Sequence, residues 1–262
     1  MKKSLIIFLS IIAVLVLIPL IFFSLMGYVP GLSTVFGADK PEDLGVTYTE
    51  ADFNSAHQKS AIVYETLPPS TADNASIQFS GSHQTDTSYN SAEMTALLNK
   101  RPWKYWPISN VQMRINADNT VEMTGIINSD KLRGYAAGIQ VPSAVSDRIS
   151  LLPTEAAFYL KGTAALSENN VSKFDITGAK LGKISIPANI LLSGLTTDLV
   201  NTALADDLTS ELSQYSGKKA YIVDFINGRL DWVSGFFANS AYFSDQKLYF
   251  KGTVPDKELT VQ

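Results

Sequence analysis

Cysteine is absent from the 262 residues of this chain. The chain therefore has no disulfide, no thiolate nucleophile, no cysteine metal ligand and no lipidated cysteine. Histidine is nearly absent, with only His57 and His83. These two fall in different expected elements without metal-ligand spacing, and we interpret both as solvated surface residues. A hydrolase that pairs a serine with one of them is an alternative, but no nucleophile–base motif accompanies either histidine.

Motifs that hold phosphates, dinucleotides or catalytic zinc are missing as well. The chain has no P-loop, no G-x-G-x-x-G and no H-E-x-x-H. The only comparable stretch, Gly81-Ser82-His83, lacks the spacing of a G-x-S-x-G nucleophile elbow. Basic tracts are also missing and the net charge is −4, so nucleic acid is not an expected partner.

Acidic residues gather at one place, Asp198, Asp206, Asp207 and Glu211. Carboxylates grouped in this way can serve acid–base chemistry or bind a cation. Nothing else in the sequence converges on them, so we interpret the group as a solvated acidic face. We therefore expect no catalytic residue, no cofactor and no metal site.

Charge is absent between Lys3 and Asp39. The apolar run from Leu5 to Met26 is long enough, as a helix, to cross about 30 Å of hydrocarbon at about 1.5 Å per residue. Lysines precede the run, which predicts a cytoplasmic N-terminus and an extracytoplasmic remainder. A cleaved signal peptide is the alternative, but its apolar core would be about 7–15 residues and end in a better cleavage site.

The chain is expected to have three parts. Residues 1–27 form a cytoplasmic tip and a transmembrane anchor. Residues 28–46, punctuated by glycine and proline, form a juxtamembrane linker. Residues 47–262 form one extracytoplasmic α+β domain, which is long enough to bury a substantial core.

A long helix is expected between Ile184 and Gly217. Pro187 suits a first helical turn, and Gly217 can take the left-handed conformation that ends a helix. Apolar residues recur between them at helical spacing. Because the apolar stripe drifts around the helix, either a curved sheet wraps the helix or the helix bends near Ala205-Asp206-Asp207. The candidate lipid-groove residues on this helix are Leu192, Leu195, Leu199, Ala203, Leu204 and Leu208.

Shorter helices and an antiparallel sheet are expected around the long helix. The helices are 49–62, which opens with a capping box at Thr49, then 91–99 and 129–137, with a further short one at 142–149. The clearest hairpin pairs 111–115 with 121–125. Further strands are expected at 77–89, 157–166, 171–179, 221–226, 229–235 and 247–254. Asn227-Gly228 is the strongest hairpin turn signal among them.

The densest aromatic cluster contains Trp103, Tyr105 and Trp106, flanked by cations and prolines. Amphipathic rings beside cations suit lipid headgroups, so these residues are a candidate membrane-interface tip. The alternative is a loop that folds its rings onto the edge of the sheet.

The order of these features resembles a known family. The short helix Ser91–Asn99, the 111–125 hairpin, the 182–187 stretch leading into a long helix, and the Asn227-Gly228 hairpin follow one another. This order is similar to the TULIP-like, tubular lipid-binding domains of bacterial envelope proteins, including YceB-type lipoproteins and anchored YpmS-like proteins. The resemblance implies a curved antiparallel sheet wrapped around a long helix, with an apolar groove for acyl chains. It carries no catalytic motif.

We therefore expect an α+β protein in which a transmembrane helix precedes a curved antiparallel sheet wrapped around a long helix. The expected function is a membrane-anchored, extracytoplasmic, non-enzymatic domain that binds lipid or another amphiphile between the sheet and the long helix. The alternative is a scaffolding envelope protein that binds protein partners through a β-rich, LEA-like sandwich.

Overall fold

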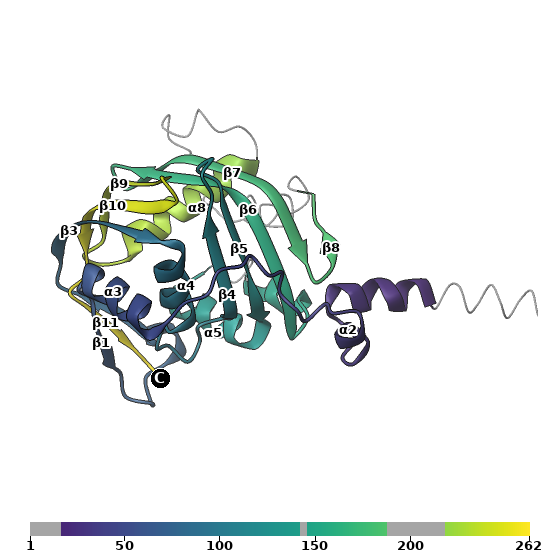
Figure 1. Cartoon of the computed structure of the whole chain (residues 1–262). Helices are drawn as coiled ribbons and strands as arrows, with labels where there is room; N and C mark the ends of the chain where they lie inside the picture. Colours follow the sequence, from purple (N-terminus) through teal and green to yellow (C-terminus); the bar gives the residue numbers. More distant parts are fainter. Residues whose placement is uncertain (1–16, 142–145, 188–217) are drawn as a thin grey trace, which may run out of the picture.

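The computed structural model describes residues 17–141, 146–187 and 218–262, and they form an α+β fold (Figure 1). Residues 17–26 are helical, and the further helices are α2 (Leu32–Val35), α3 (Glu50–Ser60), α4 (Ser91–Asn99), α5 (Ser129–Gly138) and α8 (Lys218–Trp232), with short 3₁₀ turns η1 (Asp73–Ala75) and η2 (Asp147–Leu151). The strands are β1 (Val63–Thr66), β2 (Ile77–Ser80), β3 (His83–Asn90), β4 (Ile108–Ile115), β5 (Val121–Asn128), β6 (Glu155–Ser167), β7 (Asn170–Leu181), β8 (Ile184–Ser185), β9 (Phe237–Ser244), β10 (Lys247–Val254) and β11 (Lys257–Thr260).

The large sheet is a curled antiparallel half-barrel in the order β3-β10-β9-β6-β5-β4, with β7 and β8 added beside β6 (Figure 1). Its centre is the long β6–β7 hairpin. One edge of β6 pairs with β7, and the other pairs first with β5, over residues 155–162, and then with β9, over residues 165–167. The sheet therefore forks along β6, and the fork turns β9, β10 and β3 away from the direction of β4 and β5.

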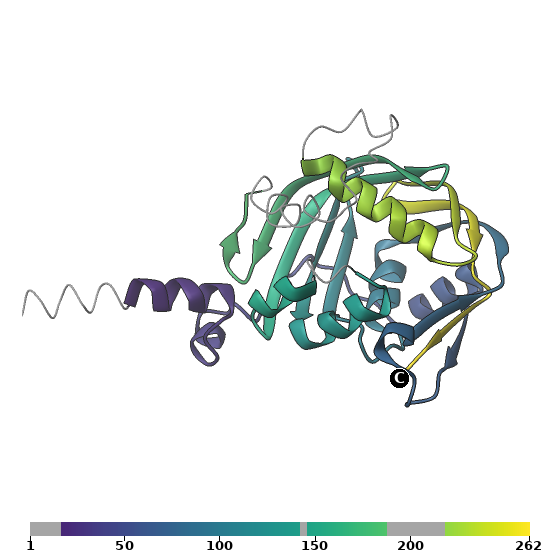
Figure 2. The same ribbon diagram turned by 180° about the vertical axis from the view of Figure 1, so that it is seen from behind.

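The two faces of the sheet differ in polarity because side chains alternate along each strand. On one face, Met113, Met123, Leu160 and Ala179 lie side by side across four strands. On the other face, Arg114, Glu122 and Lys161 pair in the same way. We call these the inner and the outer face, because α5 and α8 lie on the apolar side of the curl (Figure 2).

The inner helices are held at several points. Val223 and Ile226 of α8 pack against Leu166, Val171 and Phe174 of the β6–β7 hairpin. In the C-terminal half of α8, the Arg229 guanidinium donates to the carbonyl of Ile139, just after α5, at 2.6 Å. The same half is bound to the tip of the hairpin, because Asn169 donates to the Asp231 carboxylate at 2.7 Å. The β6–β7 hairpin and the end of α5 therefore both hold this half of α8, which lies on the inner side of the curl (Figure 2).

Helix α4 protects the free edge of β4. Its Thr95 hydroxyl accepts from the backbone N–H of Met113 at 3.0 Å, and the Asn99 side chain both accepts from and donates to the backbone of Val111. Ser91 accepts from the N–H of Ile115 at 3.0 Å. These three residues recur every fourth position along α4, so one stripe of the helix takes the place of a neighbouring strand.

A small second sheet joins distant parts of the chain. Strand β11 lies between β1, to which it is parallel, and β2, to which it is antiparallel. Glu258 of β11 is buried and receives two hydrogen bonds from Arg101, at 3.0 and 2.6 Å. The small sheet therefore pairs two early strands, β1 and β2, with a strand that comes much later in the sequence, β11.

Several elements confirm the sequence-based expectations. The capping box of Thr49 and Asp52 opens α3, and Asn90 caps α4. The β4–β5 and β6–β7 hairpins, α5 and β10 lie where they were expected. The fold also excludes the alternative of a sandwich without helices, because α3, α4, α5 and α8 are integral to the described fold.

The expected hairpin at Asn227-Gly228 is wrong. Residues 218–232 form the single helix α8, so the strands expected at 221–226 and 229–235 do not exist. The side chain of Asn227 accepts from the N–H of Val171 at 2.9 Å, so this asparagine docks the helix on β7. A strand that had not been expected, β9, follows instead and pairs with β10.

Neither expected long helix, the N-terminal one nor the one over 184–217, lies wholly within the described residues. Among the described residues, none of the helices is both long enough and apolar enough to span a bilayer, and residues 5–16 of the apolar run lie outside them. The long helix was expected over 184–217. Ile184 and Ser185 belong to strand β8, and residues 188–217 lie outside the described part.

Residues 38–46, which we call the strap, cross the outer face of the sheet from β6 to β4 (Figure 1). The N–H of Ala157 donates to the carbonyl of Ala38 at 3.1 Å, and Lys180 pairs with Glu42 at 2.5 Å. The N–H of Leu44 donates to Gln112 at 2.7 Å. The segment expected to be a linker is therefore fastened to the sheet along this stretch.

Candidate functional site

The inner face of the sheet is the strongest candidate for a binding site. Across β4 to β7 it presents Met113, Met123, Phe158, Leu160 and Leu181 in neighbouring positions. Met113 is buried, whereas the other four are only half-buried. Large apolar side chains that a fold leaves half-covered on a concave surface are typical of sites for apolar ligands.

The inner face continues past α8 toward the tip of the β6–β7 hairpin. Ala164 lies on this face between Gly162 and Leu166, and it is exposed. It pairs with Phe174, which packs against α8. Burial raises the pKa of Asp224, in α8, above its ordinary value. Burial at this one position therefore disfavours the charged form of the Asp224 carboxyl.

The candidate groove residues from the sequence, Leu192, Leu195, Leu199, Ala203, Leu204 and Leu208, lie outside the described residues, and so does the acidic group Asp198, Asp206, Asp207 and Glu211. The inner-face residues of the sheet were not singled out from the sequence. Their signal was the alternation of Phe158 and Leu160 with Tyr159 and Lys161, which marks a strand with one apolar face.

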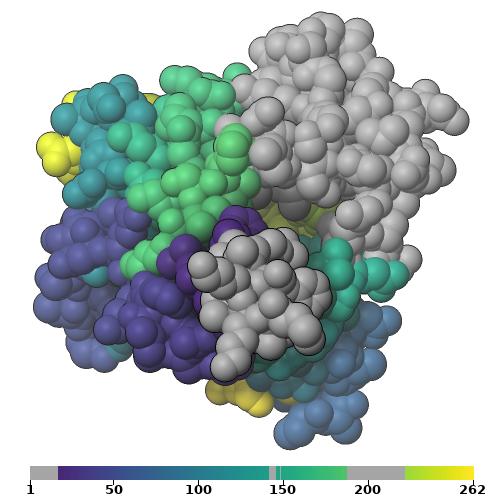
Figure 3. All heavy atoms as spheres, turned by 90° about the vertical axis from the view of Figure 1, so that its right-hand side faces the viewer, coloured from purple at the N-terminus to yellow at the C-terminus, as the bar shows by residue number. Residues whose placement is uncertain are grey.

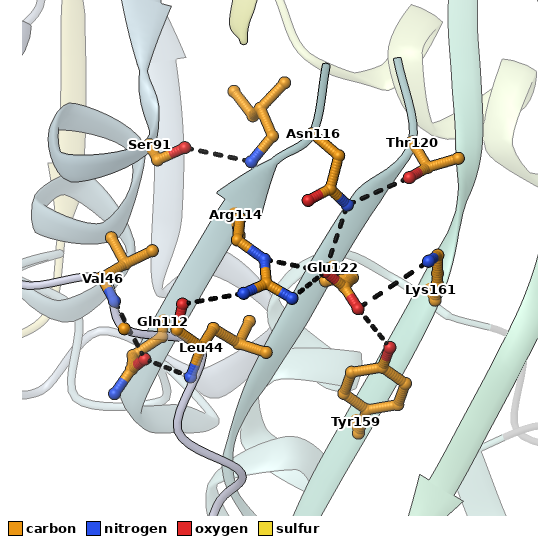
Figure 4. A network of polar contacts seen from close by, with 12 residues as sticks. Leu44, Val46, Ser91, Gln112, Arg114, Asn116, Thr120, Glu122, Tyr159 and Lys161 are labelled. Atoms are coloured by element: carbon orange, nitrogen blue, oxygen red, sulfur yellow. Dashed lines mark hydrogen bonds and ion pairs between the residues drawn. The ribbon is translucent and has the colours of Figure 1, made fainter. Parts of the chain in front are cut away.

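The outer face carries a polar network centred on Glu122 (Figure 4). One oxygen of Glu122 accepts from the Arg114 guanidinium at 2.8 and 2.5 Å and from Asn116 at 3.1 Å. The other accepts from the hydroxyl of Tyr159 at 2.6 Å, with Lys161 at 4.0 Å. The carboxylate, on β5, is thus surrounded by donors from β4, from the turn that follows β4, and from β6.

These contacts shift the pKa values of both partners. Burial alone would raise the pKa of the Glu122 carboxyl, but the hydrogen bonds from Tyr159, Arg114 and Asn116 outweigh it and lower the pKa to about 2. Burial, together with the hydrogen bond to Glu122, raises the pKa of Tyr159 to about 12. Arg114 also donates to the carbonyl of Leu44 at 3.1 Å, so the network holds the strap (Figure 4). The network therefore fixes the strap to the outer face of the sheet.

The aromatic cluster is placed differently from the expected membrane-interface tip. Trp103 is only 4% exposed and packs against Tyr135 of α5, so the expectation of an exposed tip is wrong for this residue. Trp106 is half-buried and donates to the carbonyl of Leu98 at 2.6 Å, beneath the Arg101 guanidinium. Tyr105 is half-buried and donates to Asp73. The cluster joins α5, α4 and the small sheet.

Within the part of the chain that the structure describes, neither histidine ring is hydrogen-bonded to a serine hydroxyl. The ring of His57 stacks between Phe53 and Tyr64. The two ring nitrogens of His83 contact the Asp256 carboxylate at 2.8 Å and the carbonyl of Ser60 at 3.0 Å, so neither faces a serine hydroxyl. Both histidines are engaged with neighbours, which differs from the expected solvated state.

Within residues 17–141, 146–187 and 218–262, no three acidic residues or histidines gather closely enough to hold a metal ion.

Comparison with protein-family models, with curated proteins and with solved structures finds no match for this chain.

Proposed function

We propose that this protein is a membrane-anchored, extracytoplasmic, non-enzymatic domain that binds a lipid or another amphiphile on the inner face of its curled sheet. The apolar N-terminal segment is the proposed anchor. The TULIP-like arrangement suggested by the sequence, a sheet wrapped around a long helix, is part of this proposal.

One observation carries it. Met123, Phe158, Leu160 and Leu181 form a continuous apolar surface on the concave side of the sheet and remain half-buried. Burying apolar surface contributes about 25 cal/mol per Å². An acyl chain bound along this surface would remove it from water and be stabilised accordingly. An inner face in contact with water lacks this stabilisation. Among the described residues, those at the centre of the outer face are charged or polar, Arg114, Glu122 and Lys161, so that face offers no comparable apolar surface there.

The test uses the full chain purified in a mild detergent. Lipid extraction followed by mass spectrometry should recover a bound lipid or fatty acid. A fluorescent phospholipid should bind the delipidated protein. Ala164→Trp places a large ring on the inner face at an exposed position, and it should weaken binding by about tenfold, equivalent to about 1.4 kcal/mol.

A matched control comes from the preceding residue. Thr163 lies on the outer face of the same strand, so Thr163→Trp should leave the affinity unchanged. Equal effects of the two variants, or the absence of any bound or binding lipid, would overturn the proposal. The scaffolding alternative, with protein partners on the domain surface, would then be favoured.

A further inference from the structure

The end of the N-terminal helix is locked to one end of the sheet. The N–H of Lys183, in the turn between β7 and β8, donates to the carbonyl of Leu25 at 2.8 Å. A Cβ on Gly182 would approach that carbonyl oxygen to 2.2 Å, so the turn can sit there only because this residue is glycine. The hydroxyl of Tyr28 donates to the carbonyl of Leu151 at 2.6 Å. The helix therefore leaves the domain in a fixed direction (Figure 1).

Exposed apolar side chains gather around this junction. Residues 28–38 fold back beside the helix and form α2, which exposes Leu32 by 36%, Val35 by 78% and Phe36 by 39%. Leu151, held beside Tyr28, is 64% exposed. We call Leu32, Val35, Phe36 and Leu151 the collar. Figure 3 looks onto this end, where the residues of α2 lie next to those of β7 and β8.

Two lysines and an aspartate lie beside the α2 part of the collar. The Lys183 side chain lies against Gly37 and reaches the carbonyl of Lys40 at 3.5 Å. The carboxylate of Asp39 accepts from the hydroxyl of Thr34 at 2.8 Å. Exposed apolar residues next to lysines are typical of surfaces that enter the headgroup region of a bilayer.

We propose that the collar is a second contact with the bilayer, and that it seats this end of the domain directly on the membrane surface. The inference rests on the membrane anchor of the proposed function. If the apolar run ending at Met26 crosses the bilayer, Tyr28 and α2 must lie at the interface, because the junction leaves no free chain between them. The position of the collar favours the bilayer over a protein partner, because the collar lies where the proposed anchor leaves the domain.

Contact of the collar with the membrane would also determine where the inner face lies relative to the bilayer. Leu181 of the inner face immediately precedes Gly182, which touches the helix end. The apolar surface of the sheet therefore starts at the membrane, and an amphiphile could pass from the bilayer to the inner face without crossing water.

The test exploits the absence of native cysteine. Val35→Cys and Leu151→Cys are labelled with an environment-sensitive fluorophore, and the full chain is reconstituted in nanodiscs that contain lipids with nitroxide groups near the headgroup. Both labels should be blue-shifted and quenched. A label at Tyr242→Cys, an exposed position on the outer face of β9, should be neither.

A second measurement separates the collar from the anchor. Val35→Asp should remove most of the quenching at a Leu151→Cys label while the chain stays in the nanodisc. Val63→Asp, at an exposed valine of β1, should not. Labels at Val35 and Leu151 that behave like the label at Tyr242 would overturn the collar contact while leaving lipid binding on the inner face intact. Failure of the chain to enter nanodiscs would overturn the anchor and the collar together.

Discussion

At the residue scale, Glu122 is an acid whose charge is stabilised by donors from the strands on both sides of it, β4 and β6, and from the turn after β4. Its folded pKa of about 2 lies below the ordinary value of 4.5. A lowered carboxyl pKa contributes stability that is present above the ordinary pKa and is lost as the pH falls through the folded pKa. The stability that Glu122 contributes is therefore lost as the pH falls from about 4.5 to about 2.

Glu122→Gln should thus destabilise the protein by about 2 kcal/mol at neutral pH, because the charge that orders Arg114 and Tyr159 is gone. The difference between the variant and the wild type should shrink between pH 4.5 and pH 2. Urea unfolding at several pH values measures this. Asp86→Asn, which removes an exposed carboxylate 3.5 Å from Lys251, is the control and should change little. A difference that is constant with pH would show that Glu122 acts only through packing.

Glu258 is the second residue whose charge depends on a neighbour. Burial raises the pKa of its carboxyl, although the Arg101 guanidinium opposes this shift. Arg101→Met should cost about 3–5 kcal/mol, because it leaves a buried carboxyl without a partner. Adding Glu258→Gln to this variant should recover part of the loss, since no buried charge then remains. Thermal or urea unfolding of the four proteins gives the coupling energy.

The control for this cycle is Arg133→Met, which removes an exposed guanidinium that pairs with Asp130 on α5. It should have little effect. A double variant as unstable as Arg101→Met alone would show that the guanidinium acts by stacking on Trp106 rather than by neutralising Glu258.

At the scale of elements, α4 decides whether the edge of β4 stays closed. Thr95→Val preserves shape but leaves the N–H and the carbonyl of Met113 without the hydroxyl that they share, at 3.0 and 3.4 Å. We expect a loss of about 1–3 kcal/mol and a greater tendency to aggregate through the open edge. Urea unfolding and light scattering measure the two effects. Thr177→Val, at an exposed threonine of β7, is the control. Equal stability of the two variants would contradict the proposed edge protection.

Elements were predictable where local chemistry decides them. Helix caps act within a few residues, and the structure has helices that begin after Thr49 and Asn90. Turn residues also act locally, and the β6–β7 hairpin turns at the left-handed residues Glu168 and Asn169. Asn227-Gly228 has the same local chemistry but lies inside α8. Its neighbours Ile222, Val223 and Ile226 have the spacing of a helix face, and packing against β7 outweighs the turn preference.

The candidate site was harder to predict than the elements. The inner face exists only because β4, β5, β6 and β7 pair in one register, and sequence gives no direct signal for which strands pair. Likewise, Trp103 looked suited to an interface, but Gly138 of α5 leaves room for its ring in the interior. Long-range packing of this kind cannot be read from a local pattern.

At the scale of the whole molecule, the strap links the α2 end of the domain to the edge strand β4. Gln112 accepts from the N–H groups of Leu44, at 2.7 Å, and Val46, at 3.3 Å. Gln112→Leu should therefore speed hydrogen exchange at these two amides severalfold while leaving the β5–β6 amides protected. Hydrogen-exchange mass spectrometry measures this. Gln78→Leu, at an exposed glutamine on β2, is the control. Unchanged exchange at 44–46 would show that Arg114 and Lys180 hold the strap without Gln112.

The position of β11 between β1 and β2 has a consequence for biosynthesis. Strands β1 and β2 have no sheet partner in the described chain except β11, and β3 pairs only with β10. Strands β1, β2 and β3 therefore stay unpaired until β10 and β11 have been synthesised. Such long sequence separations slow folding. This topology makes the pairing of the earliest strands of the domain depend on the synthesis of β10 and β11.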